Sequence, residues 1–311
     1  HEMANKSARQ ALFIITAISV FIVVLGLAFR APLLSFIFGK VDADVMENSM
    51  VYFFYTVLSY PFIALYDAGA SIFRAQENTR GPMVISIISN VMNIVGNGIL
   101  IWVFHMGVAG AAISTLVSRI FCAVVVLYQL RKDRQPIVVR DYLKIRPDGK
   151  MIGRILALGI PSGIENSMFQ LGKLAIQSTV STLGTTAIAA QAMTNMLEML
   201  NGTAVIGVGI GLMTVVGQSL GAGRKDEAVY YMKKLMIFSE VFLIACCAVV
   251  YVLARPITMI GGMEAKSAEM CLDMMFWITI VKPIVWMFAF IPAYGMRAAG
   301  DVKFSMITSC I

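Results

Sequence analysis

The chain has 311 residues, of which 59% are hydrophobic and 14% charged, with a formal net charge of +7 and a mean hydropathy of +0.80. Soluble domains carry roughly 25% charged residues. A soluble chain of this length would need far more polar surface to cover its core. The composition therefore excludes an ordinary soluble protein and predicts an integral membrane protein.

Nine segments of the chain are strongly apolar, and the first eight each reach the roughly 20 residues that a spanning helix needs. Glycine and proline occur inside these long segments, which favours helices over the shorter alternating strands of a membrane barrel. The sequence therefore predicts an all-α fold with a ninth, partial span from Val302. The complete spans are expected at 10–38, 49–73, 82–105, 108–130, 152–182, 186–220, 229–259 and 267–296.

The connections between these segments alternate in charge along the chain. One set is basic and includes Lys6, Arg80 and Arg131, whereas the other set is acidic or uncharged. Because basic loops stay in the cytoplasm, we expect a multi-pass protein of the inner (plasma) membrane with its basic loops on the cytoplasmic side. Topology thus accounts for the positive charge, so the expected partner is the lipid bilayer and no nucleic acid.

Two stretches of the chain repeat one another: YPFIALYDAGASIFRAQENTRGPM and KPIVWMFAFIPAYGMRAAGDVKFSM. Pro61 aligns with Pro283, and Arg74 aligns with Arg297. The copies lie six predicted spans apart, an even number, so both have the same orientation in the membrane. The complete protein is therefore predicted to have twelve spans in two parallel six-helix lobes.

On that scheme the chain holds helices three to ten and the start of helix eleven. The polar stretch RKDRQPIVVRDYLKIRPDGK separates the two lobes. We therefore expect an N-terminal lobe at 1–130, a cytoplasmic linker at 131–150 and a C-terminal lobe at 151–311.

Three of the predicted helices carry a polar stripe on one face, at helical spacing. The stripe on 152–182 contains Asn166, Gln170, Lys173 and Gln177, with Glu165 on nearly the same side. The stripe on 186–220 contains Gln191, Asn195, Glu198 and Asn201. The stripe on 82–105 contains Ser86, Asn90, Asn93 and Asn97.

The stripes have two interpretations. Asn and Gln form interhelical hydrogen bonds in membranes, so the stripe on 82–105 can serve packing alone. A charge at mid-bilayer costs at least about 2.5–3.5 kcal/mol on insertion scales. Glu165, Lys173 and Glu198 therefore favour a water-filled pathway, unless Lys173 simply neutralises one of the two acids.

Two further charges lie alone inside apolar segments: Asp67, and Lys282 beside Pro283. A proline next to a charge suits a moving gate or a static bend. The candidates for ion coupling are therefore Glu165, Glu198 and Asp67. The candidates for a substrate cavity are Asn166, Gln170, Lys173, Gln191, Asn195, Asn90, Asn93, Asn97 and Lys282, with Thr115 added by the resemblance given below.

Motifs of catalysis and cofactor binding are absent from the sequence. The GxG patterns of GVGIGLMTVVGQSLGAG do not follow a strand, so they fail the context of a dinucleotide site. No Walker lysine motif or HExxH occurs, and none of the five cysteines lies in a CxxC pattern. We expect no enzyme, no metal site and no organic cofactor.

Four stretches resemble the multidrug and toxin extrusion (MATE) transporters: VGQSLGAGRKDEA, GIPSGIENSM, NVMNIVGNGILIWVFHMGVAGAAIST and the repeated turn FRAQENTRGPM/MRAAGDVKFSM. The resemblance covers essentially the whole chain, from the third helix into the eleventh. It implies two six-helix lobes around a central cavity. It also implies export of small organic compounds, often cationic drugs, against inward Na⁺ or H⁺ flow by alternating access. We expect such a transporter to be a monomer.

The resemblance also indicates where an ion site would lie. The Asn-x-x-x-Asp pattern of the fifth helix reads Asn93 and Asn97 here, and Thr115 matches a hydroxyl of the sixth helix. The seventh-helix acid of some members falls at Phe169, and Glu165 lies one helical turn earlier on the same face. Glu165 is thus the leading candidate for ion coupling.

Two other interpretations stay open. A flippase of lipid-linked oligosaccharides or polysaccharides, from the same superfamily, would use a basic cavity, for which Lys173, Lys282 and Arg119 are available. A passive channel or a membrane scaffold is an alternative of a different class. A channel would conduct without a coupling ion, and a scaffold would bind no substrate.

Overall fold

The computed structural model describes residues 2–38, 43–132, 137–139 and 147–310. These ranges contain helices and turns and no strand, which confirms the predicted all-α fold. The chain forms two compact units, His1–Ile155 and Leu156–Ile311. Of the predicted linker, residues 133–136 and 140–146 lie outside the described ranges, and the lobe boundaries stay a prediction.

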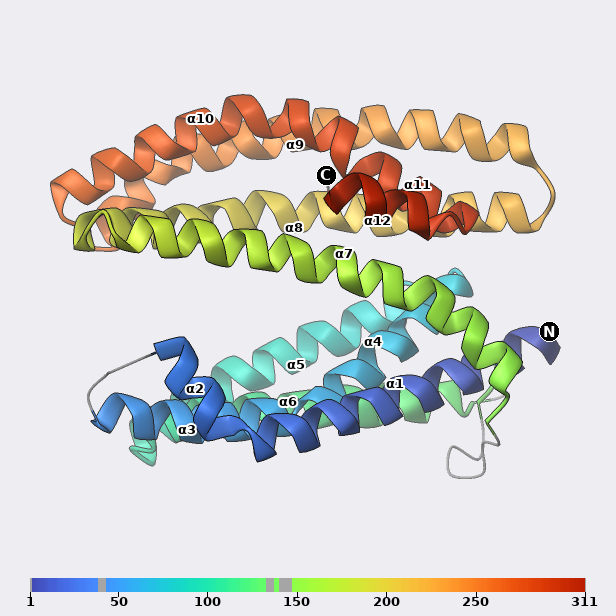
Figure 1. Ribbon diagram of the computed structural model, residues 1–311, viewed down its shortest axis with the longest axis horizontal. Coiled ribbons are helices and arrows are strands. Elements are labelled where there is room, and N and C mark those ends of the chain that lie inside the picture. Colours follow the sequence, from blue (N-terminus) through green and yellow to red (C-terminus); the bar gives the residue numbers. More distant parts are fainter. Residues whose placement is uncertain (1, 39–42, 133–136, 140–146, 311) are drawn as a thin grey trace. The chain divides into compact units, whose positions relative to one another are not determined.

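The helices of the first unit follow in chain order with short connections, and Figure 1 draws them from blue to green. They are α1 (Glu2–Ala28), α2 (Arg30–Phe38), α3 (Ala43–Leu58), α4 (Tyr60–Ala75), α5 (Arg80–Gly98), the π-helical turn η1 (Ile99–Val103) and α6 (Gly107–Leu130). Helix α6 packs against α3, α4 and α5, and α1 packs against α3 and α4.

The second unit contains most of α7 (Gly149–Ser181) and all later helices, drawn from green to red in Figure 1. These are α8 (Thr185–Gly221), α9 (Lys225–Ile260), α10 (Ala265–Ala289), α11 (Ile291–Ala299) and α12 (Val302–Cys310). Helices α8, α9 and α10 all pack on one another, and α11 packs against α8.

Seven helical segments of the described ranges are long and apolar enough to cross a membrane. They correspond to seven of the eight complete spans expected from the sequence. The eighth expected span, 152–182, does form the 33-residue helix α7, but this helix is not among the seven. Its polar stripe, with Glu165 and Lys173, lowers its hydropathy below that of the seven apolar segments.

The long apolar segments are broken at particular residues. Ser59 separates α3 from α4, and Phe290 separates α10 from α11. In both cases a proline, Pro61 or Pro292, stands in the first turn of the next helix, where its missing N–H leaves no helical bond unmade. Helix α10 instead continues through Pro283, so its break lies at Phe290 and not at the proline beside Lys282.

Each unit has its own apolar core. In the first unit Phe73, Val126 and Leu130 are fully buried where α4 and α6 meet. In the second unit, Leu212 of α8 and Leu243 of α9 are fully buried. Many large apolar side chains are instead exposed along the helices, as expected for helices whose outer faces contact lipid.

Candidate functional site

Glu165 on α7 is held by two other helices of the second unit. Its Oε1 lies 2.7 Å from Nη2 of Arg297 on α11, and its Oε2 accepts a hydrogen bond of 3.2 Å from the hydroxyl of Ser305 on α12. Only 11% of the Glu165 side chain and 20% of the Arg297 side chain are exposed. The leading ion-coupling candidate is therefore an ion-paired carboxylate.

Local structure places Arg297 in this position. It occupies the last turn of α11, which ends at Gly300 in the left-handed conformation (φ 86°). A cation near the last carbonyl groups is favoured by the helix dipole, and glycine adopts this φ without strain. The guanidinium also lies 5.5 Å from the ring centroid of Tyr294, so both the helix end and the ring stabilise its charge.

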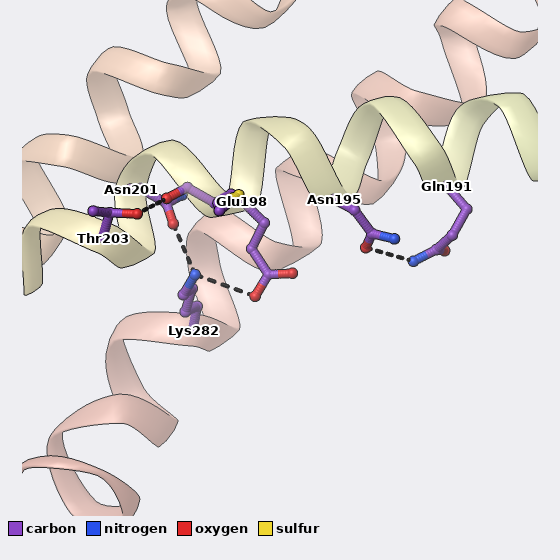
Figure 2. A network of polar contacts seen from close by, with 7 residues as sticks. Gln191, Asn195, Glu198, Asn201, Thr203 and Lys282 are labelled. Atoms are coloured by element: carbon purple, nitrogen blue, oxygen red, sulfur yellow. Dashed lines mark hydrogen bonds and ion pairs between the residues drawn. The ribbon is translucent and has the colours of Figure 1, made fainter. Parts of the chain in front are cut away.

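A second charged group joins α8 and α10 (Figure 2). Nζ of Lys282 lies 3.2 Å from Oε1 of Glu198 and 2.7 Å from Oδ1 of Asn201. The ammonium also lies 5.4 Å from the ring centroid of Trp286, one turn further along α10. We call Glu198, Asn201, Lys282 and Trp286 the Lys282 cluster. It combines one acid, one base, the buried amide of Asn201 and the half-buried ring of Trp286 inside the second unit.

The remaining predicted residues of α8 lie apart from this cluster. Gln191 donates a 3.0 Å hydrogen bond to Asn195 on the next turn of the same helix, as Figure 2 shows. The hydrogen bond between these two side chains lies within α8, and Asn195 is exposed. Of the predicted stripe on this helix, only Glu198 and Asn201 therefore contact another helix through the hydrogen bonds described.

The stripe of α7 is exposed except at Glu165. Asn166 and Gln170 line a shallow hollow of about 410 Å³ on α7. Lys173 lies 4.9 Å from the ring centroid of Phe169 on its own helix. In the described ion pairs, Glu165 pairs with Arg297 and Glu198 pairs with Lys282. Lys173 is therefore not the base that neutralises either acid.

In the first unit, the structure brings Asn93, Asn97 and Thr115 together. The amide of Asn93 donates to the Thr115 hydroxyl at 3.3 Å and to Ser114 at 3.4 Å. Asn97 donates to Asn93 at 3.3 Å, whereas Asn90 is exposed. This polar cluster joins α5 and α6 without a charged member, which agrees with interhelical packing.

Asp67 on α4 is exposed. Arg74 and Arg119 are close enough to act on its charge. The guanidinium of Arg119, on α6, donates a 2.5 Å hydrogen bond to the buried hydroxyl of Ser59. Arg119 is thus fixed at the break between α3 and α4, a role that its position in the sequence did not indicate.

Comparison with known proteins identifies the family. The family model MatE matches residues 1–99 and 161–311, which is most of the chain. The chain belongs to the MatE family. This result confirms the resemblance to MATE transporters that the sequence motifs predicted.

Curated relatives of this MatE chain include two bacterial proteins. The chain is 26% identical over 257 residues to the probable multidrug resistance protein YoeA of Bacillus subtilis, with 80% of this chain and 55% of the relative covered. It is 25% identical over 241 residues to the probable multidrug resistance protein NorM of Thermotoga maritima, with 75% and 51% covered. The chain thus spans about half the length of these relatives.

Two solved transporter structures have the same fold. A MOP superfamily transporter from Pyrococcus furiosus superposes with a TM-score of 0.89 at 18% identity, over 99% of this chain and 69% of that chain. An outward-facing multidrug resistance MATE family transporter superposes with a TM-score of 0.88 at 18% identity, over 98% and 68%. The MatE chain is therefore a multi-pass membrane protein of transporter fold.

Proposed function

We propose that the protein exports small organic compounds, often cationic drugs, by secondary antiport against inward Na⁺ or H⁺ flow. The observation that carries the proposal is the position of Glu165 and Glu198, two carboxylates on helices of the second unit, each paired with a base from another helix. The curated relatives YoeA and NorM are both described as probable multidrug resistance proteins, which supports the same function.

The ion pair of Glu165 gives antiport a physical basis. Protonation of the carboxylate, or binding of Na⁺ to it, competes directly with Arg297. The Glu165 carboxylate connects α7 to Arg297 on α11 and to Ser305 on α12. An ion bound to this carboxylate would therefore weaken the contact between α7 and these two helices. A ligand shifts a conformational equilibrium only through such differential interactions, so Glu165 is the proposed coupling residue.

The proposal includes a location and an orientation. The bacterial relatives support the plasma membrane, and the charge pattern supports cytoplasmic basic loops. In this proposal a monomer in the lipid bilayer provides the whole transport pathway.

The flippase interpretation has less support from the charges. A lipid-linked pyrophosphate needs an excess of positive charge, whereas Lys282 and Arg297 are both neutralised by carboxylates at 3.2 Å and 2.7 Å. Lys173 lies against Phe169 instead and adds one exposed charge. The paired bases therefore favour organic compounds of low net charge over a multiply charged anion.

Efflux of ethidium or norfloxacin from an efflux-deficient host tests the proposal. The full-length gene is expressed as wild type and as Glu165→Gln, with the Na⁺ gradient and the external pH varied. Glu227→Gln is the matched control, because Glu227 pairs with Arg224 on the exposed surface. We expect ion-dependent efflux for wild type and control, and loss of the ion dependence for Glu165→Gln.

Other outcomes are equally informative. Unchanged ion dependence in Glu165→Gln would make Glu165 structural and move the coupling site to Glu198 or Asp67. Efflux that needs no ion gradient would indicate a channel. Absence of efflux for every organic cation under every gradient would refute drug export and favour the flippase.

A further inference from the structure

The Lys282 cluster has hydrogen-bonding capacity that its own residues leave unused. We infer that it is a recognition site for the carboxylate of zwitterionic aromatic compounds, in which Lys282 and Asn201 bind the carboxylate. The inference rests on the proposed export function and names a class of compound that this site selects.

The cluster contains buried donors that have no acceptor among the described residues. Lys282 uses two of its three N–H groups on Glu198 and Asn201. Asn201 is fully buried, yet its Nδ2 has no partner among the described residues, and the same is true of the buried Nε1 of Trp286. Buried donors without acceptors are unfavourable. A carboxylate supplies two acceptor oxygens and therefore fits this arrangement.

The charges of the cluster select a ligand without net charge. Glu198 and Lys282 together are neutral, and an added lone anion or cation would leave an uncompensated charge in the membrane. A zwitterion adds none. Its carboxylate would meet Lys282, whose side chain is 11% exposed, while its cationic group would meet Glu198, whose side chain is 35% exposed.

An aromatic row begins at the same cluster. The Trp286 ring stacks on Phe290 with centroids 4.2 Å apart and an interplanar angle of 18°. Phe290 in turn meets Phe169 of α7 edge to face at 5.7 Å. Flat aromatic compounds bind to such rings by stacking. The ligand class therefore combines a planar ring system with a carboxylate that reaches Lys282.

A matched pair of dyes isolates the carboxylate. Rhodamine 110 carries a free carboxylate and is a zwitterion, and rhodamine 123 is its methyl ester and a cation. Binding of both is measured by fluorescence polarisation with the purified full-length protein in detergent. The variants are Lys282→Met, Lys282→Arg and Asn201→Asp. Lys266→Met is the control, because Lys266 is an exposed lysine on the same helix.

The readout is the preference for the acid over the ester, as a ratio of dissociation constants. We expect wild type, Lys282→Arg and Lys266→Met to prefer rhodamine 110. In Lys282→Met the preference should fall about tenfold, the effect of losing a hydrogen bond to a charged group. Rhodamine 123 should still bind, which shows that the variant is folded.

Two results would overturn the site. One is a wild type that does not prefer the acid, and the other is a Lys282→Met preference equal to that of wild type. If Lys282→Met binds neither dye, Asn201→Asp decides, because it removes the Nδ2 donor and must also lower the preference. Efflux of both dyes from cells tests export separately. If the dyes are exported but the protein does not prefer rhodamine 110 in the binding assay, the site alone is rejected. If the protein prefers rhodamine 110 but exports neither dye, the export function is rejected.

Discussion

Arg297 on α11 and Glu165 on α7 form an ion pair of 2.7 Å, although they belong to helices that are distant in the sequence. Ser305 on α12 donates to the same carboxylate. Helix α7 thus contacts two later helices of the second unit through one acid. A pair with so little exposure is costly to break, because the remaining charge loses the interaction with Arg297 in a place that little water reaches.

The first prediction concerns this pair. Arg297→Gln should lower the free energy of unfolding by about 2–4 kcal/mol, slightly less than for fully buried pairs because both side chains keep some exposure. The double variant Glu165→Gln/Arg297→Gln should recover much of the loss. Unfolding of the detergent-solubilised protein, followed by circular dichroism, measures both effects.

The control for this prediction is Arg224→Gln. Arg224 and Glu227 form a 3.1 Å pair whose side chains are both largely exposed, and exposed pairs contribute about 0–1 kcal/mol. A loss as small in Arg297→Gln as in Arg224→Gln would mean that water or lipid headgroups already screen the Glu165 pair.

The second prediction concerns helix packing at Gly209. A Cβ atom on Gly209 would lie 2.5–2.9 Å from ring atoms of Tyr294, whereas one on Gly211 would meet nothing within 4 Å. Overpacking of this kind costs about 1–3 kcal/mol. Gly209→Ala should therefore lower the melting temperature, and Gly211→Ala should not. Equal melting temperatures would show that the Tyr294 ring moves aside without cost.

Sequence patterns predicted the helices well, because hydropathy and periodicity are local properties. The segments 108–130 and 186–220 match α6 and α8 closely. The break at Phe290 was not predicted. Pro283 is the proline that the sequence places beside a charge, yet α10 continues through it and ends where Pro292 can begin a new helix.

The partners of the charged residues were less predictable, because a pair between helices depends on tertiary packing. Glu165, Glu198 and Lys282 were recognised as costly charges, but Lys173 was considered as the neutralising base. Arg297 was noted only as the repeat partner of Arg74. That repeat did contain a signal, since both arginines end a short helix, but no sequence pattern assigned Arg297 to Glu165.

The third prediction concerns the break between α3 and α4. Ser59 is fully buried and accepts a 2.5 Å hydrogen bond from Arg119. Ser59→Ala should lower the free energy of unfolding by about 1.5–3 kcal/mol, the usual range for hydrogen bonds to charged groups. Ser71→Ala is the control, because Ser71 accepts a similar 2.8 Å bond from Arg74 on an exposed surface. Equal effects of the two variants would show that Arg119 finds another acceptor.

The fourth prediction concerns pH and the start of α7. Lys6 forms an ion pair with Asp148, whose Oδ1 also accepts the backbone N–H groups of Lys150 at 3.0 Å and Met151 at 3.2 Å. The hydrogen bond from Lys6, followed by that from Met151, lowers the pKa of the Asp148 carboxyl below its ordinary value. Asp148 thereby caps α7 as a carboxylate.

A lowered pKa in the folded state determines the direction of the effect. The stabilisation is fully present above the unfolded pKa of about 3.9 and is lost as the pH falls through the lower folded pKa. The melting temperature of wild type should therefore drop more between pH 6 and pH 3 than that of Asp148→Asn, which keeps the cap without the charge. Lys6→Gln should reduce the drop in the same way, because it removes the main cause of the shift. If wild type and Asp148→Asn show the same drop over this range, Lys6 and Asp148 do not interact in the folded protein.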